Sequence, residues 1–456
     1  MQALKTQKPD HIIKYRKGNI MNLRIIALLA SLISVEAIAA DKIVIISPHR
    51  KSIQEEYIPV FKQYYKDQFK TDVQVDWIDQ GGTSNDIRFI RSKFSVNPKT
   101  SEVDLFWGGG TVAFLELQSD KLLDKFEPSA ALKKNLPAEA AGVAMYDKSK
   151  TWYASAMSSF GIFYNKKLLA IEKLPEPKTW EDLADPKFLN KLSLADPRHS
   201  GSAGSMNTII LQSLGWEKGW EILTAQGGNN RQWAHSSSDP IKAVVAGDAA
   251  VAPAIDFYAM AKIGDIGKEN LGFAIPVGKS VLDPDPVAIL KGAPNRKVAE
   301  RFVEWVLGTD AQAILVLPKG AAGGPRMESL ARMAVNTDTY VKTEGKRIEG
   351  IINPFAQKSF LKLDNEKAAK LKRPLDDLIG ALLIDNHKDL KTAWQRVIKN
   401  GAKPADLAAL SKMPVTEAEL LALAEKWDDN VLRNETINKW VNFAREKYLK
   451  VGGSTH

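Results

Sequence analysis

Three short apolar segments near the start of the chain each run into a loop of small or polar residues, and a helical pattern follows each loop. The segments cover residues 42–47, 73–77 and 103–107. Short apolar strands that alternate with helical patterns predict an α/β fold with a mainly parallel sheet. Ligands bind such sheets outside the carboxyl ends of the strands, so these loops are expected to line a binding site.

Polar residues in these loops are the first candidate ligand contacts. The first loop offers a hydroxyl and an imidazole, whereas the second and third are rich in glycine and small polar residues. The candidates are Ser47, His49, Gly82, Thr83, Ser84 and Gly109. For His49 the alternative interpretation is that the imidazole only caps the helix that follows.

A second candidate site follows the predicted strand at residues 192–194. Pro197 keeps the residue before it out of the helical region, and small residues then open an apolar helix that runs through Leu214. The first amides of a helix lack internal partners, and the helix dipole adds partial positive charge there, so this helix start suits a phosphate or a carboxylate. The predicted anion contacts are His199, Ser200, Gly201, Ser202 and Ala203. Ordinary serine capping of the helix is the alternative.

Further candidate contacts come from three later segments. Residues 152–164 are predicted to be extended and to cross between two lobes, with two serines in their middle. A serine cluster precedes Asp239, and a small-residue strand at 249–254 leads into an acid and a tyrosine. These segments contribute Ser158, Ser159, Ser237, Asp256 and Tyr258 to the predicted site.

The N-terminal segment has the pattern of a cleaved signal peptide. Arg24 precedes the apolar run 25–35, which is too short to span a bilayer comfortably, and small residues at 37–39 suit a signal peptidase. We therefore expect a mature chain that starts at Ala40 or Asp41 and resides in the periplasm; translation starting at Met1 or at Met21 fits this pattern. The chain has no cysteine, which excludes a lipidated cysteine, disulfides and thiolate catalysis.

Charge and motifs argue against nucleic-acid binding and against catalysis. The net charge is +9, but part of it lies in the leader and the remaining surface has mixed signs. The segment 278–280 resembles the end of a phosphate-binding loop, yet Phe273 stands where that motif requires glycine. Ser202 lies between Gly201 and Ala203 and does not complete the G-x-S-x-G pattern of a nucleophile elbow. A binding protein, not an enzyme, is therefore predicted.

The order of these motifs resembles the extracellular solute-binding proteins of ABC importers, in the branch that includes ferric-ion-binding proteins. The resemblance spans residues 41–345 and rests on Ser47-Pro-His49, Gly81-Gly-Thr-Ser84, Asp104-Leu-Phe-Trp-Gly108, Thr179-Trp-Glu-Asp-Leu183, Ser200 to Gly204, Asp285 to Pro294, and Ala299 to Trp305. It implies an α/β, two-lobe periplasmic-binding-protein (type II) fold that closes on a solute. It also implies a permease and ATPase complex in the inner membrane as partner.

The resemblance and the helical patterns together predict five parts of the chain. A leader occupies 1–40, lobe one 41–155 and 283–345, lobe two 156–282, and a helical C-terminal extension 346–456. Within the extension, Pro374 and Asn434 are expected to start helices, Asn386 to cap one, and Thr416 with Glu419 to form a capping box. The apolar stripes on these helices predict that the extension packs on the body of the protein.

The ferric branch of the family implies a set of metal ligands with which the residues of this chain can be compared. Its pattern uses a histidine, an acid and two adjacent tyrosines, and here His49 and Tyr258 match, Phe257 replaces the first tyrosine, and the acid has no clear counterpart. We therefore expect a small phosphate- or carboxylate-bearing solute and no resident cofactor. The alternatives are transport of Fe(III) with a synergistic anion, held by His49 and Tyr258, and a periplasmic ligand sensor that reports to a membrane partner.

Overall fold

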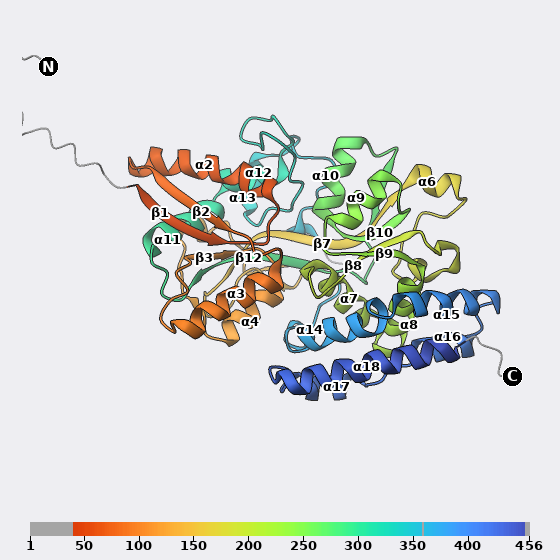
Figure 1. Ribbon diagram of the computed structural model, residues 1–456. Helices are drawn as coiled ribbons and strands as arrows, with labels where there is room; N and C mark the ends of the chain where they lie inside the picture. Colours follow the sequence, from red (N-terminus) through yellow and green to blue (C-terminus); the bar gives the residue numbers. More distant parts are fainter. Residues whose placement is uncertain (1–39, 358–359, 452–456) are drawn as a thin grey trace, which may run out of the picture. The chain divides into compact units, whose positions relative to one another are not determined.

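The computed structural model describes residues 40–357 and 360–451, and the described residues from Asp41 onward form one compact unit (Figure 1). The predicted leader, its cleavage site and the choice of start codon concern residues that lie outside the described ranges, except Ala40. No helix within these ranges has the length and apolar character needed to cross a membrane.

One mixed sheet runs through this unit. Its strands follow the order β2-β1-β3-β12-β7-β10-β8-β9, with β4 beside β12 and β11 beside β7. These strands are β1 (Asp41–Ile46), β2 (Val73–Ile78), β3 (Leu105–Trp107), β4 (Leu123–Asp124), β7 (Tyr153–Asn165), β8 (Leu192–Ala195), β9 (Asn230–Ala234), β10 (Val251–Ile255), β11 (Leu271–Ala274) and β12 (Leu282–Leu290). A separate hairpin pairs β5 (Glu139–Ala140) with β6 (Val143–Ala144).

Lobe one is built on β1, β2 and β3, which pair in parallel as their apolar patterns predicted. Helices pack on both faces of these strands (Figure 1). α11 buries Val298, Phe302 and Val306 in the main core of this lobe. The helices of lobe one are α2 (Lys51–Phe69), α3 (Thr83–Val96), α4 (Thr111–Ser119), α5 (Ala130–Lys133), α11 (Arg296–Val306), α12 (Thr309–Val316) and α13 (Thr337–Lys342).

Lobe two is built on β8, β9 and β10 and has its own core, centred on Trp180, Trp220 and Phe188. In Figure 1, α9 and α10 lie on one face of these strands and α7 and α8 on the other. Its helices are α6 (Lys166–Ile171), η1 (Glu181–Ala184), η2 (Pro186–Phe188), α7 (Gly201–Leu214), α8 (Trp216–Asn229), α9 (Asp239–Ala246) and α10 (Asp256–Ile266). The exact boundaries of the two lobes stay a prediction.

Two long antiparallel strands, β7 and β12, connect the lobes. β7 pairs with β12 through residues up to Ser159 and with β10 from Phe160 onward. β12 runs through residues 283–286, although two of these four residues are prolines. A register shift between Asp285 and Pro286 interrupts the pairing, and such a bulge accommodates prolines that lack an N–H for the ladder.

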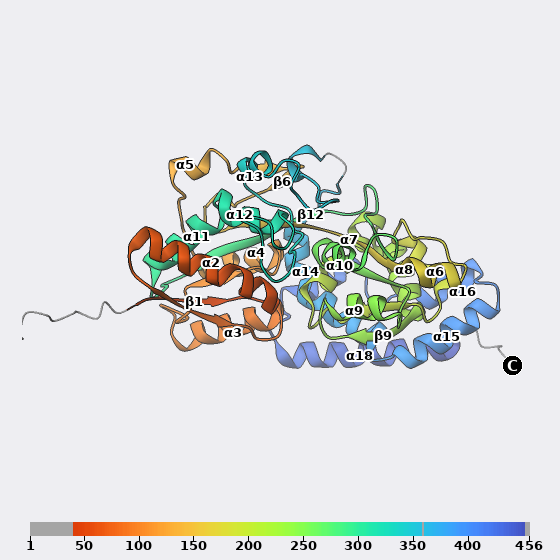
Figure 2. The same ribbon diagram turned by 90° about the horizontal axis from the view of Figure 1, so that it is seen from above.

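The C-terminal extension packs on lobe two, as its apolar stripes predicted. Trp394 of α15 lies so close to Gly228 of α8 that a Cβ there would approach the indole to 2.5 Å, and its Nε1 donates to Asn229 Oδ1 over 2.7 Å. Figures 1 and 2 show the extension helices along lobe two. They are α14 (Asn365–Ile379), η4 (Gly380–Ile384), α15 (His387–Lys399), α16 (Pro404–Ser411), α17 (Glu417–Ala424) and α18 (Asn430–Lys450). The first element of the extension, η3 (Pro354–Ala356), packs instead on lobe one, where Phe355 lies against the core.

Three details of the extension correct the sequence-based expectation, while the capping box of Thr416 and Glu419 is confirmed. Pro374 lies inside α14 instead of starting a helix. α18 begins at Asn430, where Asp429 caps two amides, and not at Asn434. Asn386 does not cap α15 through its side chain, because its amide nitrogen donates to Ala381 O and Val441 O.

Candidate functional site

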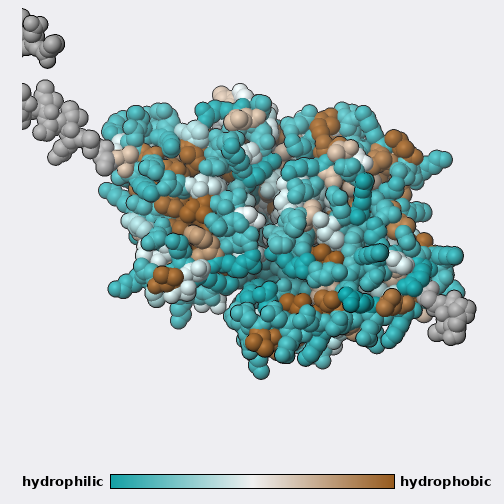
Figure 3. Space-filling view, viewed as in Figure 1, coloured by the Kyte–Doolittle hydropathy of each residue, from teal (hydrophilic) through white to brown (hydrophobic). Residues whose placement is uncertain are grey.

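A cavity of about 280 Å³ lies where the two lobes face each other. Its walls come from the loops that follow β1, β2 and β3 in lobe one and β8, β9 and β10 in lobe two, together with β7 and β12. Figure 3 shows a hydrophilic hollow between the lobes. The loops at the carboxyl ends of the strands therefore converge, as expected for an α/β site.

Most of the predicted contact residues line this cavity, namely His49, Gly82, Thr83, Gly109, Ser158, His199, Ser200, Gly201, Ser202, Ser237 and Tyr258. The other predicted contacts do not line it, namely Ser47, Ser84, Ser159, Ala203 and Asp256. Ser47 Oγ accepts from the His49 amide, and Ser84 Oγ accepts from Lys372 of the extension. The amide and hydroxyl of Ser159 both donate to Asp256 Oδ2.

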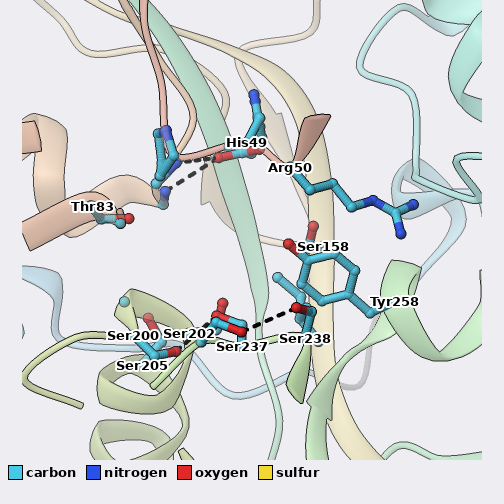
Figure 4. A pocket seen from close by; sticks show the side chains of 18 of the residues that line it. His49, Arg50, Thr83, Ser158, Ser200, Ser202, Ser205, Ser237, Ser238 and Tyr258 are labelled. Carbon is cyan, nitrogen blue, oxygen red and sulfur yellow. Dashed lines mark hydrogen bonds and ion pairs between the residues drawn. The ribbon is translucent and has the colours of Figure 1, made fainter. Parts of the chain in front are cut away.

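The start of α7 forms a serine-rich cradle, which we define as residues 200–205 together with Ser237. Ser200 Oγ accepts from the Ala203 amide over 3.2 Å and lies 2.8 Å from Ser237 Oγ. The amides of Gly201 and Ser202 make no hydrogen bond within the part of the chain that the structure describes. Figure 4 shows the hydroxyls of this cradle gathered on one side of the pocket. Capping and anion binding are therefore compatible here, because Ser200 fills the first role and leaves two amides for the second.

Lobe one touches lobe two beside the cradle. A Cβ on Gly82 would lie 2.7 Å from the carbonyl oxygen of His199, and the φ of Gly82 is +130°. Only glycine fits this position, because a side chain would collide and the backbone is in a region that L residues rarely adopt. The cavity is thus closed on this side by direct contact between the lobes.

Opposite the cradle is a buried ionic cluster, which we define as His49, Asp285 and Arg332. His49 Nε2 lies 2.7 Å from Asp285 Oδ2 and 3.1 Å from Arg332 Nη1, and Arg332 Nη2 forms an ion pair with Asp285 Oδ2. The other carboxylate oxygen of Asp285 accepts from the amides of Gly109 and Gly110, over 2.8 and 3.3 Å. Asp285 therefore fixes both the guanidinium and the loop that opens α4.

The protonation states of the cluster follow from burial and charge. Burial alone would raise the pKa of Asp285, but Arg332 and His49 outweigh it and hold that pKa well below its usual range. Burial lowers the pKa of His49, so the imidazole is neutral near pH 7. Next to the cluster, burial raises the pKa of Asp283 to about 7, although Thr111 Oγ1 donates to its carboxylate over 2.7 Å.

Two aromatic residues at the start of α10 face two guanidinium groups. Arg332 Cζ lies 4.3 Å from the ring centroid of Phe257, and Arg50 Cζ lies 5.0 Å from that of Tyr258. Arg50 also pairs with Glu328 over 2.6 Å. Figure 4 shows Arg50 beside Tyr258. Positive charge therefore lies against both positions at which the ferric pattern places tyrosine ligands.

No group of three or more His, Asp or Glu side chains close enough to hold a metal occurs among residues 40–357 and 360–451. The two predicted metal ligands have other partners here, since His49 contacts Asp285 and Tyr258 contacts Arg50. Metal binding by this pair stays a prediction.

Sequence reasoning missed several cavity residues, namely Arg50, Asp79, Ser205, Ser236, Ser238, Asp283, Asp285 and Arg332. Arg50 follows His49 directly, so the same loop signal could have included it. The Asp-Pro-Asp-Pro segment could be recognised in the sequence, but its pairing within a strand could not be predicted from it. Arg332 carries no local signal, because a lone arginine in an irregular segment is typical of a solvated surface.

A family model described as "Bacterial extracellular solute-binding protein" matches residues 108–337, about half of the 456-residue chain. The phosphoglycerate transport regulatory protein PgtC of Salmonella typhimurium is 30% identical over 185 residues, which cover 41% of this chain and 46% of that protein. The chain thus spans about half the length of this curated relative.

Solved structures of low identity support the fold. The periplasmic binding protein AfuA from Actinobacillus pleuropneumoniae, with fructose-6-phosphate bound, has a TM-score of 0.59 at 20% identity and covers 78% of this chain and 98% of its own. The apo ferric ion-binding protein A of Pasteurella haemolytica has a TM-score of 0.56 at 19% identity, with 76% and 98% covered. The two-lobe fold with a helical C-terminal region is therefore confirmed, and the chain belongs to the family of bacterial extracellular solute-binding proteins.

Proposed function

We propose that this protein is the solute-binding component of an ABC importer in the periplasm and that it captures a small anionic solute by hinge closure. The solute carries a phosphate or a carboxylate and is passed unchanged to a permease and ATPase complex in the inner membrane. Family membership supports the binding role. The importer partner, the periplasmic location and the anionic solute belong to the proposal.

The serine-rich cradle is the observation that supports an anionic solute. Two amides of α7, those of Gly201 and Ser202, lack acceptors within the described residues while the serine hydroxyls line the same cavity. Hydrogen bonds from amides to an anion are stronger than those between neutral groups, and the helix dipole adds to them. The cradle therefore binds an anion without any lysine or arginine of its own.

The cavity also limits the size of the solute. Its volume of about 280 Å³ lies near the lower end of the range for small-molecule sites, which starts at about 300 Å³. One similar protein is named for phosphoglycerate transport and another was solved with fructose-6-phosphate bound, and both compounds are phosphorylated. Both facts support a compact phosphorylated solute.

Fe(III) with a synergistic anion is the second candidate, and the similarity to a ferric ion-binding protein favours it. The site itself disfavours it, because a hard trivalent cation needs several anionic oxygen ligands. Phe257 offers no oxygen, and Arg50 and Arg332 place positive charge against the two aromatic positions. We therefore rank the anionic solute above iron.

A ligand sensor that reports to a membrane partner is the third candidate. The name of the curated relative, a transport regulatory protein, favours this role. It needs the same pocket and differs only in the partner. Cross-linking in the periplasm separates the two roles, since an importer component should be captured with a permease and a sensor component with a signalling protein.

Calorimetry on a small set of variants tests the anion site. Ser202→Asp places a carboxylate at the start of α7, and because like charges brought together cost several kcal/mol, binding of phosphorylated and carboxylated solutes should weaken by at least about a hundredfold. The matched control is Ser213→Asp near the end of the same helix, which should bind normally. Tyr258→Phe should weaken binding only modestly. A coloured ferric complex that is lost in Tyr258→Phe and kept in Ser202→Asp would overturn the ranking.

A further inference from the structure

We infer that Arg332 determines the selectivity of the pocket: it is a permanent cation held between His49 and Phe257, and it receives a second anionic group of the solute where the ferric pattern would place a metal. This inference rests on the proposed function, because it concerns the same pocket. It adds that the solute carries anionic groups at two separated points, one for the cradle and one for Arg332.

Arg332 is built into the cavity wall as a rigid donor. Its side chain is 3% exposed, and three neighbours hold it: Asp285, His49 at 3.1 Å and Ser158 Oγ at 3.3 Å. Its Nε is buried and has no hydrogen-bond partner among the described residues. A buried N–H without an acceptor is costly, so the neighbours of Arg332 leave part of its donor capacity unused.

The replacement of tyrosine by Phe257 is consistent with this role. The Arg332 guanidinium lies 4.3 Å from the centroid of the Phe257 ring, within the range of a cation–π contact. The contact joins a residue of lobe one to the start of α10 in lobe two. A phenylalanine supplies the aromatic face for this contact and adds no oxygen that could bind a metal.

Arg332 lies between two positions at which the ferric pattern places metal ligands. The resemblance places a histidine ligand at 49 and a tyrosine ligand at 257, and the guanidinium of Arg332 contacts both residues. The guanidinium of Arg332 offers no ligand to a metal ion, and its pairing with Asp285 leaves that carboxylate less able to attract one. The guanidinium attracts a carboxylate or phosphate instead, since the planar fork of arginine matches the geometry of both anions.

The two anion sites lie on different sides of the pocket. Figure 4 shows His49, which contacts Arg332, on the side opposite Ser200 and Ser237. None of the hydrogen-bond partners of Arg332 belongs to the cradle. A solute with a single anionic group therefore reaches one site, whereas a short solute with two anionic groups reaches both.

A matched pair of probes tests this inference by calorimetry on the purified protein. Glycerol 3-phosphate carries one anionic group, and 3-phosphoglycerate carries the same phosphate ester together with a carboxylate. The wild type should bind 3-phosphoglycerate roughly tenfold to a hundredfold more tightly, the range expected for a hydrogen bond to a charged group. Ferric citrate serves as the metal probe and should produce no binding of iron.

The test variant is the neutral pair Arg332→Gln with Asp285→Asn, which avoids leaving a buried carboxylate unpaired. It should bind both esters with nearly equal affinity. Arg332→Lys retains the charge without the fork and should restore part of the preference. Thermal unfolding confirms that each variant is folded.

The outcomes distinguish a failure of the role inferred for Arg332 from a failure of the proposed function. An unchanged preference for 3-phosphoglycerate in the neutral pair, or equal binding of both esters by the wild type, overturns the role of Arg332 and leaves the proposed anionic solute standing. Binding of neither ester by the folded wild type overturns the proposed function together with this inference. Tight binding of ferric ion by the wild type also overturns the inference.

Discussion

The two sides of the pocket hold negative charge by different means. The cradle uses backbone amides and hydroxyls from one helix start together with the Ser237 hydroxyl, and apart from Ser237 its residues are neighbours in the sequence. The ionic cluster uses side chains from three distant segments, namely the neutral imidazole of His49 and the charged groups of Asp285 and Arg332. Open amides are solvated at little cost when the pocket is empty, whereas a buried charge must stay paired at all times. The cradle therefore serves binding alone, and the cluster serves both binding and stability.

The largest difference should appear when each side loses one residue. Arg332→Ala leaves the Asp285 carboxylate buried without its cation, so the free energy of unfolding should fall by about 3–5 kcal/mol. Ser202→Ala removes only a partly exposed hydroxyl and should change it by less than about 0.5 kcal/mol. Urea denaturation of both variants measures the difference. Equal stability of the two variants would contradict the claim that the cluster, unlike the cradle, stabilises the fold.

The same difference explains how much of the site could be predicted from sequence. The cradle follows from contiguous residues, since Pro197 and the run of small residues fix a helix start whatever the rest of the chain does. The α/β order follows likewise from local patterns. The cluster depends on β12 pairing with β7 and on an irregular segment reaching Ser158. No local pattern encodes such long-range contacts, so Arg332 was missed.

The extension shows that a clear local signal in the sequence can also be overridden by tertiary packing. A proline usually ends a helix, so Pro374 was expected to start one, yet α14 continues through it. Residues of α14 around Pro374, such as Leu371, Leu375 and Leu378, are buried in the core of lobe two. This packing offsets the lost backbone hydrogen bond, and tertiary contacts of this kind override the local preference.

A change of pH should have a smaller effect on solute affinity, and this effect should come from the cluster side of the pocket. Burial raises the pKa of Asp283, beside the cluster, to about 7, so this carboxyl is neutral below that pH and negative above it. Affinity for glycerol 3-phosphate should therefore fall a few-fold between about pH 6 and about pH 8 in the wild type relative to Asp283→Asn. Taking this ratio cancels the titration of the phosphate itself. A ratio that stays constant across this range would contradict the assignment.

The smallest effect concerns a contact of the extension behind the cradle. Lys372 Nζ of α14 donates to Ser84 Oγ of α3 over 3.3 Å and so joins the extension to lobe one. Ser84→Ala should weaken solute binding by no more than about twofold, because a single long hydrogen bond contributes only about 0.5 kcal/mol of net free energy. Ser95→Ala on the exposed end of the same helix is the control and should bind like the wild type. Calorimetry with glycerol 3-phosphate compares them, and identical affinities would show that this contact plays no part in closure.

The central claim is that the pocket closes on an anionic solute held by the cradle and by Arg332. The most direct measurement is a crystal structure of the protein with the solute that it retains on purification, including anomalous data at the iron edge. We predict an anionic group within hydrogen-bond distance of the Gly201 and Ser202 amides, a second anionic group at Arg332, and no iron signal. An iron peak between His49 and Tyr258, with the cradle holding only a synergistic anion, would contradict the account.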